Sequence, residues 1–233
     1  MTIGLFIYAR NDSTRLPHKH LLKFGEDCVL GIIIERLRVI RGDIRLILLT
    51  TERSVDDPLV EFVRLNNLCE VFRGDHLNVS KRTLDAINHY NFSAFVRING
   101  DCPLVDSRLI EQGLMLFDKE TKFLTNIWPT RSYPYGISLE IINAKFYSKY
   151  FRHCNQFEKE HVTSHLYRLL DLGLLNTDSE VKSITSKVDL SNYRFVLDTP
   201  EDFKQLTNLF HSHSPITASY EELCNVEHYK RLV

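Results

Sequence analysis

Residues 3–51 read IGLFIYARNDSTRLPHKHLLKFGEDCVLGIIIERLRVIRGDIRLILLTT, and their pattern decides the fold. The apolar run 3–9 has the length of a buried strand, and 29–40 repeats its apolar residues at helical spacing. The run 44–51 is again rich in β-branched residues and leucines and has strand length. A strand, a helix and a strand in this order predict a β-α-β unit with both strands in one parallel sheet.

The same alternation continues along the chain and then changes at residue 123. Up to that point the patterns predict helices at 57–66, 80–90 and 106–117 and strands at 70–72 and 94–98. Beyond it they predict strands at 123–128, 137–142, 181–188 and 193–197, a loop at 129–136, and helices at 144–153, 158–170, 200–209 and 220–230. We therefore expect a single α/β domain with a mostly parallel mixed sheet, in which residues 123–188 form a subregion facing a second substrate.

Composition places the chain among ordinary globular proteins and excludes several other classes. Hydrophobic residues make up 43% of the 233 residues and charged residues 25%, which is enough for a core without disulfides or structural metals. A formal net charge of −1 lacks the broad positive charge of proteins that coat nucleic acid or anionic membranes. No run reaches the length of a membrane span, and the five cysteines form no CxxC pair. We expect a cytoplasmic protein with reduced thiols and no nucleic-acid or membrane partner.

The loop after the first predicted strand concentrates positive charge. It reads ARNDSTRLPHK over residues 9–19 and brings Arg10, Arg15 and Lys19 close together among hydroxyl and amide side chains. A triphosphate needs such charge-assisted donors, and ligands of parallel sheets bind at the carboxyl ends of strands. Neither the P-loop nor the dinucleotide GxGxxG pattern is present. A phosphate site and a plain solvated basic turn remain equally good interpretations of this loop alone.

Two later strand ends each carry an aspartate. Residues 97–106 read RINGDCPLVD and residues 194–203 read RFVLDTPEDF, so Asp101 and Asp198 both follow apolar runs. Singly, Asp101 is explained as a turn residue, and Asp198 or Thr199 as a helix cap. Together, opposite a basic loop, the two carboxylates predict a Mg²⁺ site, because Mg²⁺ is typically held by one or two carboxylates plus substrate phosphates.

These segments carry a family resemblance. ARNDSTRLPHK resembles the ARxxSTRLPgK signature of the bacterial sugar-acid cytidylyltransferases, and FRGDHLNVSKR, RINGDCPLVD, YPYGISLEI, EKEHVTSHLY and VLDTPEDF follow in the family's order. The chain is most similar to the spore-coat-polysaccharide (SpsF-like) type, which is related to the CMP-Kdo and CMP-N-acetylneuraminate (sialic acid) synthetases. The resemblance implies a GT-A-like three-layer sandwich, Mg²⁺ dependence, homodimerisation, and transfer of CMP from CTP to a sugar acid with release of pyrophosphate. Kdo, sialic, pseudaminic and legionaminic acid are acceptors of this class, used in surface polysaccharide or glycan biosynthesis.

The resemblance also implies roles for individual residues. The implied nucleotide-binding residues are Ala9, Arg10, Ser13, Arg15, Lys19, Arg73, Ser80, Arg82 and Asp101. The implied acceptor-binding residues are Tyr133, Gly136, Glu140, Glu160 and His161. Arg15, Lys19, Asp101 and Asp198 are the implied catalytic group, with both aspartates as metal ligands. Along the chain we expect a nucleotide-binding half at 1–122, an acceptor side at 123–188, and a metal-ligand strand with C-terminal helices at 189–233.

The histidines fit these patterns less well. His18 stands where the family has a glycine, which allows a positive φ, so the path of the loop at His18 stays open. His161 and His165 are four residues apart on a predicted helix, but the HExxH order is missing and a catalytic zinc is disfavoured. We expect them on a helix surface or in contact with substrate. His20, His211 and His213 are expected in solvent or loops.

Two alternative functions remain open. One is nucleotidyl transfer to a different acceptor, such as a sugar phosphate or a polyol phosphate, or from a different nucleotide. The other is a non-catalytic nucleotide-binding protein of the same fold. The presence of Arg15, Lys19, Asp101 and Asp198 argues against the second alternative.

Overall fold

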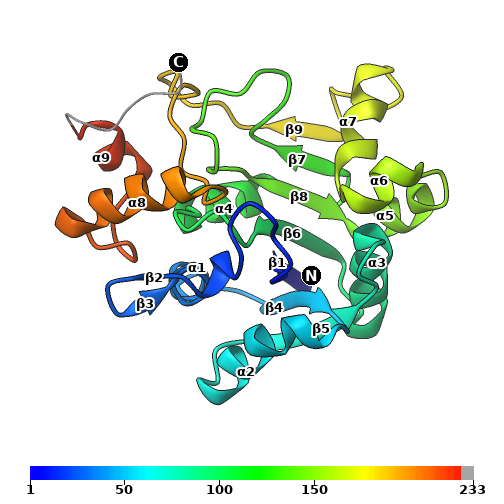
Figure 1. Ribbon diagram of the computed structural model, residues 1–233. Helices are drawn as coiled ribbons and strands as arrows, with labels where there is room; N and C mark the ends of the chain where they lie inside the picture. The colour runs from blue at the N-terminus through cyan, green and yellow to red at the C-terminus, as the bar shows by residue number, and fades with distance from the viewer. Residues whose placement is uncertain (227–233) are drawn as a thin grey trace.

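A seven-stranded sheet organises the computed structural model, which describes residues 1–226. Its strands are β1 (Ile3–Tyr8), β4 (Ile44–Thr51), β5 (Glu70–Gly74), β6 (Ala94–Asn99), β7 (Phe123–Thr125), β8 (Glu140–Asn143) and β9 (Val181–Ser183). Their order is β5-β4-β1-β6-β8-β7-β9, seen from bottom to top in Figure 1. The strands β5, β4, β1 and β6 are parallel, β8 is antiparallel to both its neighbours, and β7 is parallel to β9. The predicted α/β fold with a mostly parallel mixed sheet is confirmed.

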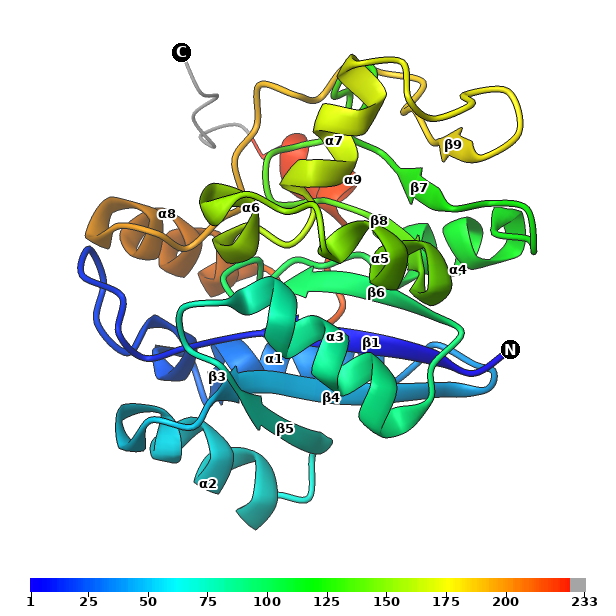
Figure 2. The same ribbon diagram turned by 90° about the vertical axis from the view of Figure 1, so that its right-hand side faces the viewer.

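Helices cover both faces of this sheet. They are α1 (Val29–Leu37), α2 (Asp57–Leu65), α3 (Val79–Tyr90), α4 (Ser107–Leu116), α5 (Ala144–Phe151), α6 (Gln156–Glu160), α7 (Ser164–Asp171), α8 (Pro200–Ser212) and α9 (Tyr220–Cys224), with 3₁₀ turns η1 (Lys19–Leu21) and η2 (Ser54–Asp56). Figures 1 and 2 show α3, α5, α6 and α7 on one face and α1, α4, α8 and α9 on the other. The result is a three-layer sandwich.

The central strand β1 shows why these residues form this core. Leu5 and Ile7 point into the apolar cluster that α1 and α4 share, whereas Phe6 points into the cluster on the α3 side. All three side chains are at most 1% exposed, and Phe6 stacks on Phe95 with 5.3 Å between ring centroids. Burying a side chain of this size stabilises the fold by about 1.5–3 kcal/mol. A continuous apolar run is therefore what a parallel strand covered on both faces requires.

The second half of the sheet is less regular than predicted. The strands expected at 123–128, 137–142 and 181–188 shorten to β7, β8 and β9. The strand expected at 193–197 is wrong: the segment makes one isolated bridge, between Arg194 and Tyr135. Its amides donate instead to loops, from Phe195 to the Tyr135 carbonyl at 2.7 Å and from Leu197 to the Asp101 carbonyl at 2.8 Å. Apolar residues thus bury an extended connection that is not a sheet member.

The helix expected at 158–170 is also wrong, because it is two helices. α6 ends where His161 adopts an extended conformation, and α7 begins after Thr163. The β-branched pair Val162 and Thr163 occupies the break, and such residues restrict helical side-chain conformations. A short hairpin of β2 (Lys23–Phe24) and β3 (Asp27–Cys28) was not predicted. The helix expected at 220–230 begins as α9 and ends at Cys224, and residues 227–230 lie outside the described part of the chain.

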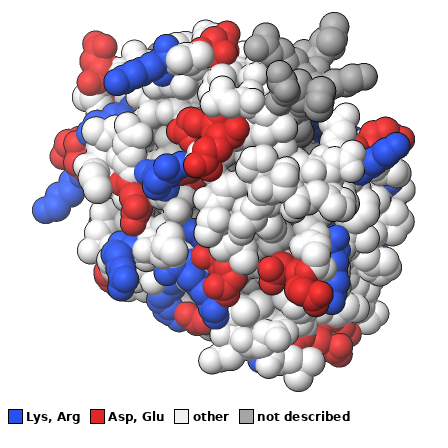
Figure 3. Space-filling view, turned by 90° about the vertical axis from the view of Figure 1, so that its left-hand side faces the viewer, with Lys and Arg blue, Asp and Glu red and all other residues white. Residues whose placement is uncertain are grey.

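Several chain-wide properties follow from the structure. Cys28, Cys69, Cys102 and Cys154 are free thiols. Within residues 1–226, no helix combines the length and the apolar character needed to cross a bilayer. Figure 3 shows basic and acidic side chains interspersed over the face that it presents.

Candidate active site

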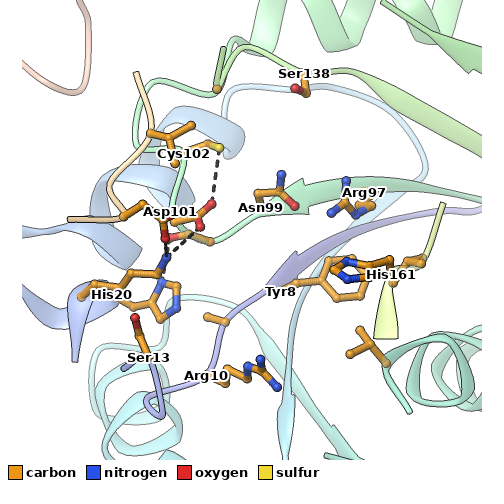
Figure 4. Close-up of a pocket in the computed structure, with 18 of the residues that line it drawn as sticks. Tyr8, Arg10, Ser13, His20, Arg97, Asn99, Asp101, Cys102, Ser138 and His161 are labelled. Atoms are coloured by element: carbon orange, nitrogen blue, oxygen red, sulfur yellow. Dashed lines mark hydrogen bonds and ion pairs between the residues drawn. The ribbon is translucent and has the colours of Figure 1, made fainter. Parts of the chain in front are cut away.

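A cavity of about 650 Å³ opens at the carboxyl ends of β1 and β6. The chain runs from β1 outward to β4 and β5 and then returns to β6 on the other side of β1, so this point is the topological switch of the sheet. The volume lies within the ~300–1,000 Å³ of typical small-ligand pockets. Figure 4 shows Asp101 and His20 at one end of the cavity, Tyr8, Arg97 and His161 at the other, and Asn99 between them. The position and size indicate a ligand site.

The loop after β1 forms one wall, and a buried carboxylate fixes where it starts. Asp56, only 1% exposed, accepts hydrogen bonds from the Asn11 backbone amide at 2.6 Å and from the Thr51 hydroxyl. The Asn11 side chain donates to the Val55 carbonyl at 3.1 Å. These contacts direct the loop across the end of the sheet toward the cavity.

His18 turns the loop back into η1. Its φ of 55° and ψ of 24° lie in the left-handed region, the conformation for which a glycine is suited. The histidine therefore adopts the backbone shape expected of the glycine it replaces, at a cost of about 1–2 kcal/mol for a residue with a Cβ. As a result the next two side chains, Lys19 and His20, point inward and are 7% and 4% exposed.

His20 links the two strand-end loops, which the sequence did not predict. Its Nδ1 donates to the Gly100 carbonyl at 2.8 Å, and burial lowers the pKa of the ring. Gly100 is confined as well, because a Cβ there would lie 2.5 Å from the Tyr8 carbonyl oxygen. The expectation that His20 is solvated is wrong: it holds the β1 and β6 loops together.

Lys19 lies between the two predicted metal ligands. Its Nζ is 2.8 Å from Asp101 Oδ2 and 2.9 Å from Asp198 Oδ1, and Arg15 reaches Asp198 Oδ2 at 2.6 Å. Burial alone would lower the pKa of Lys19, but the two carboxylates outweigh it and raise that pKa. Burial would likewise raise the pKa of Asp101, yet Lys19 outweighs it and lowers the pKa. The structure brings all four implied catalytic residues into direct contact.

Backbone contacts set the spacing of the two aspartates. The Leu197 amide donates to the Asp101 carbonyl at 2.8 Å, which ties together segments far apart in the sequence. Asp202 then accepts from the Asp198 and Thr199 amides at 2.9 and 3.0 Å. Thr199 caps α8 through a reciprocal contact with Asp202, so the Asp198 side chain is not the cap and faces the cavity.

The two carboxylates suit a cation site of a particular kind. Within residues 1–226, no group of three or more His, Cys, Asp or Glu side chains could hold a metal by itself. Asp101 and Asp198 nevertheless direct one oxygen each at a single cationic point, which Lys19 Nζ occupies. Two convergent carboxylates completed by substrate phosphates are the donor set that Mg²⁺ takes. The donors present therefore fit a divalent cation held jointly with a nucleotide.

Other predicted site residues also line the cavity: Ala9, Arg10, Ser13, Arg82, Gly136, Glu160 and His161. Arg10 Nε lies 3.1 Å from Asp12, and its NH2 lies 3.9 Å from Glu160 on the far wall. Arg82 is 2% exposed and donates to the Asp75 carbonyl at 3.1 Å. His161 reaches the cavity because the α6–α7 break lies beside it.

Four predicted site residues do not line the cavity: Arg73, Ser80, Tyr133 and Glu140. Arg73 binds the Thr51 and Arg53 carbonyls and the Asp57 carboxylate, and Ser80 donates to the Glu158 carbonyl. Tyr133 is 5% exposed and packs on Tyr220, and Glu140 is 1% exposed and pairs with Arg97 at 2.5 Å. Among these contacts, the pair of Glu140 with Arg97 is the one that reaches a residue lining the cavity.

The sequence missed other lining residues: Tyr8, Arg97, Asn99, Arg131 and Ser138. Tyr8 and Asn99 are register partners on β1 and β6, and Arg97 lies two residues before Asn99 on the same sheet face. A polar residue at alternate positions of an apolar strand end was the available signal for Arg97 and Asn99. Arg131 and Ser138 lie in an irregular loop and had no such signal.

Comparison with known sequences follows this geometry. A family model described as cytidylyltransferase matches residues 5–230. An uncharacterised protein of Methanocaldococcus jannaschii is 31% identical over 211 residues, which cover 87% of this chain and 80% of that protein. The spore coat polysaccharide biosynthesis protein SpsF of Bacillus subtilis is 26% identical over 223 residues, 89% of this chain and 86% of its own length.

Solved structures that resemble this chain include a cytidylyltransferase and a CMP-sugar synthetase. A cytidylyltransferase from Leptospira borgpetersenii superposes with a TM-score of 0.86 at 32% identity, covering 96% of this chain and 92% of its own. A CMP:2-keto-3-deoxy-manno-octonic acid synthetase in complex with CTP has a TM-score of 0.67 at 16% identity, covering 91% of this chain and 99% of its own. At that identity the second likeness concerns the fold alone.

Proposed function

The chain belongs to the cytidylyltransferase family, and from this premise we propose that it transfers CMP from CTP to a sugar acid, with Mg²⁺ as cofactor. The observation that carries the proposal is the contact of Arg15 and Lys19 with Asp101 and Asp198 in one cavity. Phosphoryl transfer needs cationic groups and a divalent metal at the transferred phosphate, and this cavity combines the two kinds of residue that would supply them. The resemblance of the motifs to those of sugar-acid cytidylyltransferases supports a sugar acid as the acceptor. The relative SpsF is, by its name, a polysaccharide biosynthesis protein.

The nucleotide's phosphates would lie along the loop after β1. The Arg15 side chain is two-thirds exposed and Lys19 is buried. Arg15 would therefore contact the phosphates from the solvent side, and Lys19 from the protein side. Both are charge-assisted donors, which bind phosphate oxygens more strongly than neutral groups do. Arg10 and Ser13, on the same wall, would complete the phosphate contacts, and Arg82 in α3 would serve the remainder of the nucleotide.

Asp101 and Asp198 would hold the divalent cation. A cation bound there supplies neutralisation of α-phosphate charge and lowers the pKa of the attacking hydroxyl. For the carboxylates to hold it, Lys19 must leave its place between them. The β- and γ-phosphates of CTP offer the lysine an alternative set of anionic oxygens, which couples nucleotide binding to cation binding.

The reaction follows from these positions. The acceptor hydroxyl oxygen forms a bond to the α-phosphorus, the bond from that phosphorus to the bridging α–β oxygen breaks, and pyrophosphate leaves. Arg15 and Lys19 stabilise the charge that builds on the leaving group. We propose that the hydroxyl proton passes to water, without a dedicated general base. Residues 123–188, with Gly136, Glu160 and His161 on the cavity, would form the acceptor side.

A pyrophosphate-release assay tests the proposal. Purified protein, CTP and Mg²⁺ are incubated with single ulosonic and nonulosonic acids, and the product is identified by mass. We expect pyrophosphate and a CMP-sugar with at least one sugar acid, and neither product when EDTA replaces Mg²⁺. Parallel reactions use sugar phosphates, polyol phosphates and the other nucleoside triphosphates.

Each outcome of this assay has a definite meaning. Turnover with a polyol phosphate but with no sugar acid would overturn the proposed acceptor while leaving the family intact. CTP binding without turnover on any acceptor would identify a non-catalytic relative. Undiminished turnover in EDTA would overturn the proposed cofactor.

A further inference from the structure

The cations that line the cavity differ in whether the protein itself neutralises them. Arg10, Arg15, Lys19 and Arg97 each pair with a carboxylate at 3.9 Å or closer. Within residues 1–226, Arg82 and Arg131 line the same cavity and form no ion pair. A cation without a counter-charge at a ligand site is available to an anionic group of the ligand.

The two unpaired arginines belong to different halves of the cavity. Arg82 lies in α3, within the nucleotide-binding half. Arg131 lies in the connection between β7 and β8, and among the described residues 123–188 it is the one lysine or arginine that reaches the cavity. Arg131 is therefore the cation that the acceptor side of the cavity offers.

The guanidinium of Arg131 is oriented but weakly engaged. It lies 5.4 Å from the centre of the Tyr135 ring, whose other neighbour, Arg194, is held by Asp202 through two hydrogen bonds of 2.9 and 3.0 Å. Arg131 NH1 is 3.4 Å from the Pro134 carbonyl and 3.5 Å from Ser138 Oγ. Both distances are beyond the 2.7–3.2 Å of a good N–H···O bond. The arginine is held in place while its donors remain available.

The loop that carries Arg131 and Ser138 is fixed at its base. The Asn126 side chain donates to the Ile137 carbonyl at 2.9 Å and accepts from the Leu139 amide at 2.8 Å. Gly136 has a φ of 105°, and a Cβ there would lie 2.7 Å from the Phe195 carbonyl oxygen. Figure 4 shows Ser138 on the wall opposite the loop of Arg10 and Ser13. The two donors are thus preorganised, which lowers the entropic cost of binding.

We infer that Arg131 and Ser138 bind the carboxylate of the acceptor. A planar guanidinium matches a carboxylate through two parallel hydrogen bonds, and the Ser138 hydroxyl beside it adds a third donor. In a 2-ulosonic acid the carboxylate is attached to the carbon that carries the reacting hydroxyl, so holding one group orients the other. The inference rests on the proposed function, and it names the residues that set acceptor specificity.

Steady-state kinetics with a sugar acid and with the same sugar reduced at its carboxylate tests this role. Arg131→Gln should raise the acceptor KM by about 10- to 100-fold, as expected when hydrogen bonds to a charged group worth about 1.5–3 kcal/mol are lost. Arg131→Lys should recover part of the lost affinity for the acceptor, because lysine keeps the positive charge but cannot donate two parallel hydrogen bonds. Ser138→Ala should raise the acceptor KM by about 3- to 10-fold, the cost of one neutral donor. The KM for CTP should change little in all three variants.

The reduced acceptor separates recognition from a structural effect. Wild-type protein should discriminate strongly against it, whereas Arg131→Gln should treat both acceptors nearly alike. Arg41→Gln is the matched control, because Arg41 is exposed and precedes β4 at the amino ends of the parallel strands, away from the cavity at their carboxyl ends. Unchanged discrimination in Arg131→Gln would overturn the inference alone. A wild-type protein that uses polyol phosphates but no sugar acid would overturn the proposed function and this inference with it.

Discussion

The two ends of the cavity handle charge differently. At the carboxylate end, Lys19 and Arg15 are bound to Asp101 and Asp198, so cations and anions satisfy each other before any ligand arrives. At the acceptor end, the Arg131 guanidinium has no carboxylate partner in the described chain and only long hydrogen bonds. The first end must exchange internal contacts for ligand contacts, whereas the second simply accepts them. Substitutions at the two ends should therefore have different signatures.

The largest effect is expected from Asp101→Asn, which removes one carboxylate and keeps the side-chain shape. Turnover in the pyrophosphate assay should fall at least about 100-fold, the scale seen when one transition-state contact is lost. Asp178→Asn is the control, because Asp178 is exposed and remote from the cavity lining. An Asp101→Asn protein that unfolds like wild type and retains full turnover would exclude Asp101 as a cofactor ligand.

Lys19→Met should separate two roles of the same ammonium group. Turnover should fall, because the leaving phosphates lose a cation. Without nucleotide, however, Mn²⁺ should bind about 10-fold more tightly by calorimetry, because a charge-assisted contact of about 1.5 kcal/mol no longer competes for the carboxylates. Lys187→Met, at an exposed position, should change neither quantity. Equal or weaker Mn²⁺ binding by Lys19→Met would show that the lysine does not compete with the cation.

Acid should weaken the ion pair between Lys19 and Asp101 and leave the contacts of Arg131 unaffected. Because the fold lowers the pKa of Asp101 below its usual 3.8, the folded state binds fewer protons there than the unfolded chain does. The resulting stabilisation is present above the usual pKa and is lost as the pH falls through the lowered folded value. The difference in unfolding free energy between wild type and Asp101→Asn, on the order of 1 kcal/mol for this partly exposed pair, should shrink in that range. Urea unfolding at several pH values measures it, and a constant difference would contradict the assignment, whereas Arg131→Gln should show no such dependence.

The smallest effect is expected at His18. His18→Gly should stabilise the protein by at most about 1 kcal/mol, because relief of left-handed strain is partly offset by the greater backbone freedom of glycine when unfolded. His18→Ala keeps the strain and should not stabilise. The KM for CTP should change little, since the loop already has the backbone shape of a glycine turn. A large rise in this KM for both variants would instead assign the imidazole to the nucleotide.

The fold of the first half could be predicted because its central strands, β1 and β4, are largely buried and are therefore mostly apolar. Residues 193–197 satisfy the same pattern but form a connection, because their amides bond to the Asp101 and Tyr135 loops. Apolar periodicity reports burial and not hydrogen-bond partners. A separate strand and a buried linker therefore look alike in sequence.

The candidate site likewise contains residues that could be predicted from the sequence and residues that could not. Asp101 and Asp198 were predictable because each follows an apolar strand-like run, and the fold brings such ends together. Arg131 could not be predicted, because its position depends on how the irregular β7–β8 connection folds back over the sheet. His20 was missed since burial of a polar ring depends on a partner in another loop, the Gly100 carbonyl.

The hydrogen bonds of Asn126 with residues 137 and 139 have a consequence for protein engineering. The Asn126 side chain closes the base of the β7–β8 connection with two hydrogen bonds. The segment from Asn126 to Leu139 therefore has defined ends and can be exchanged as a unit. The Leu197–Asp101 backbone contact lies outside those bounds, and a graft would keep it. Exchanging this segment between relatives would be a route to new acceptor choice with the catalytic residues unchanged, provided that Gly136 and the backbone contacts of Ser132 and Tyr135 with residues 190–195 are retained.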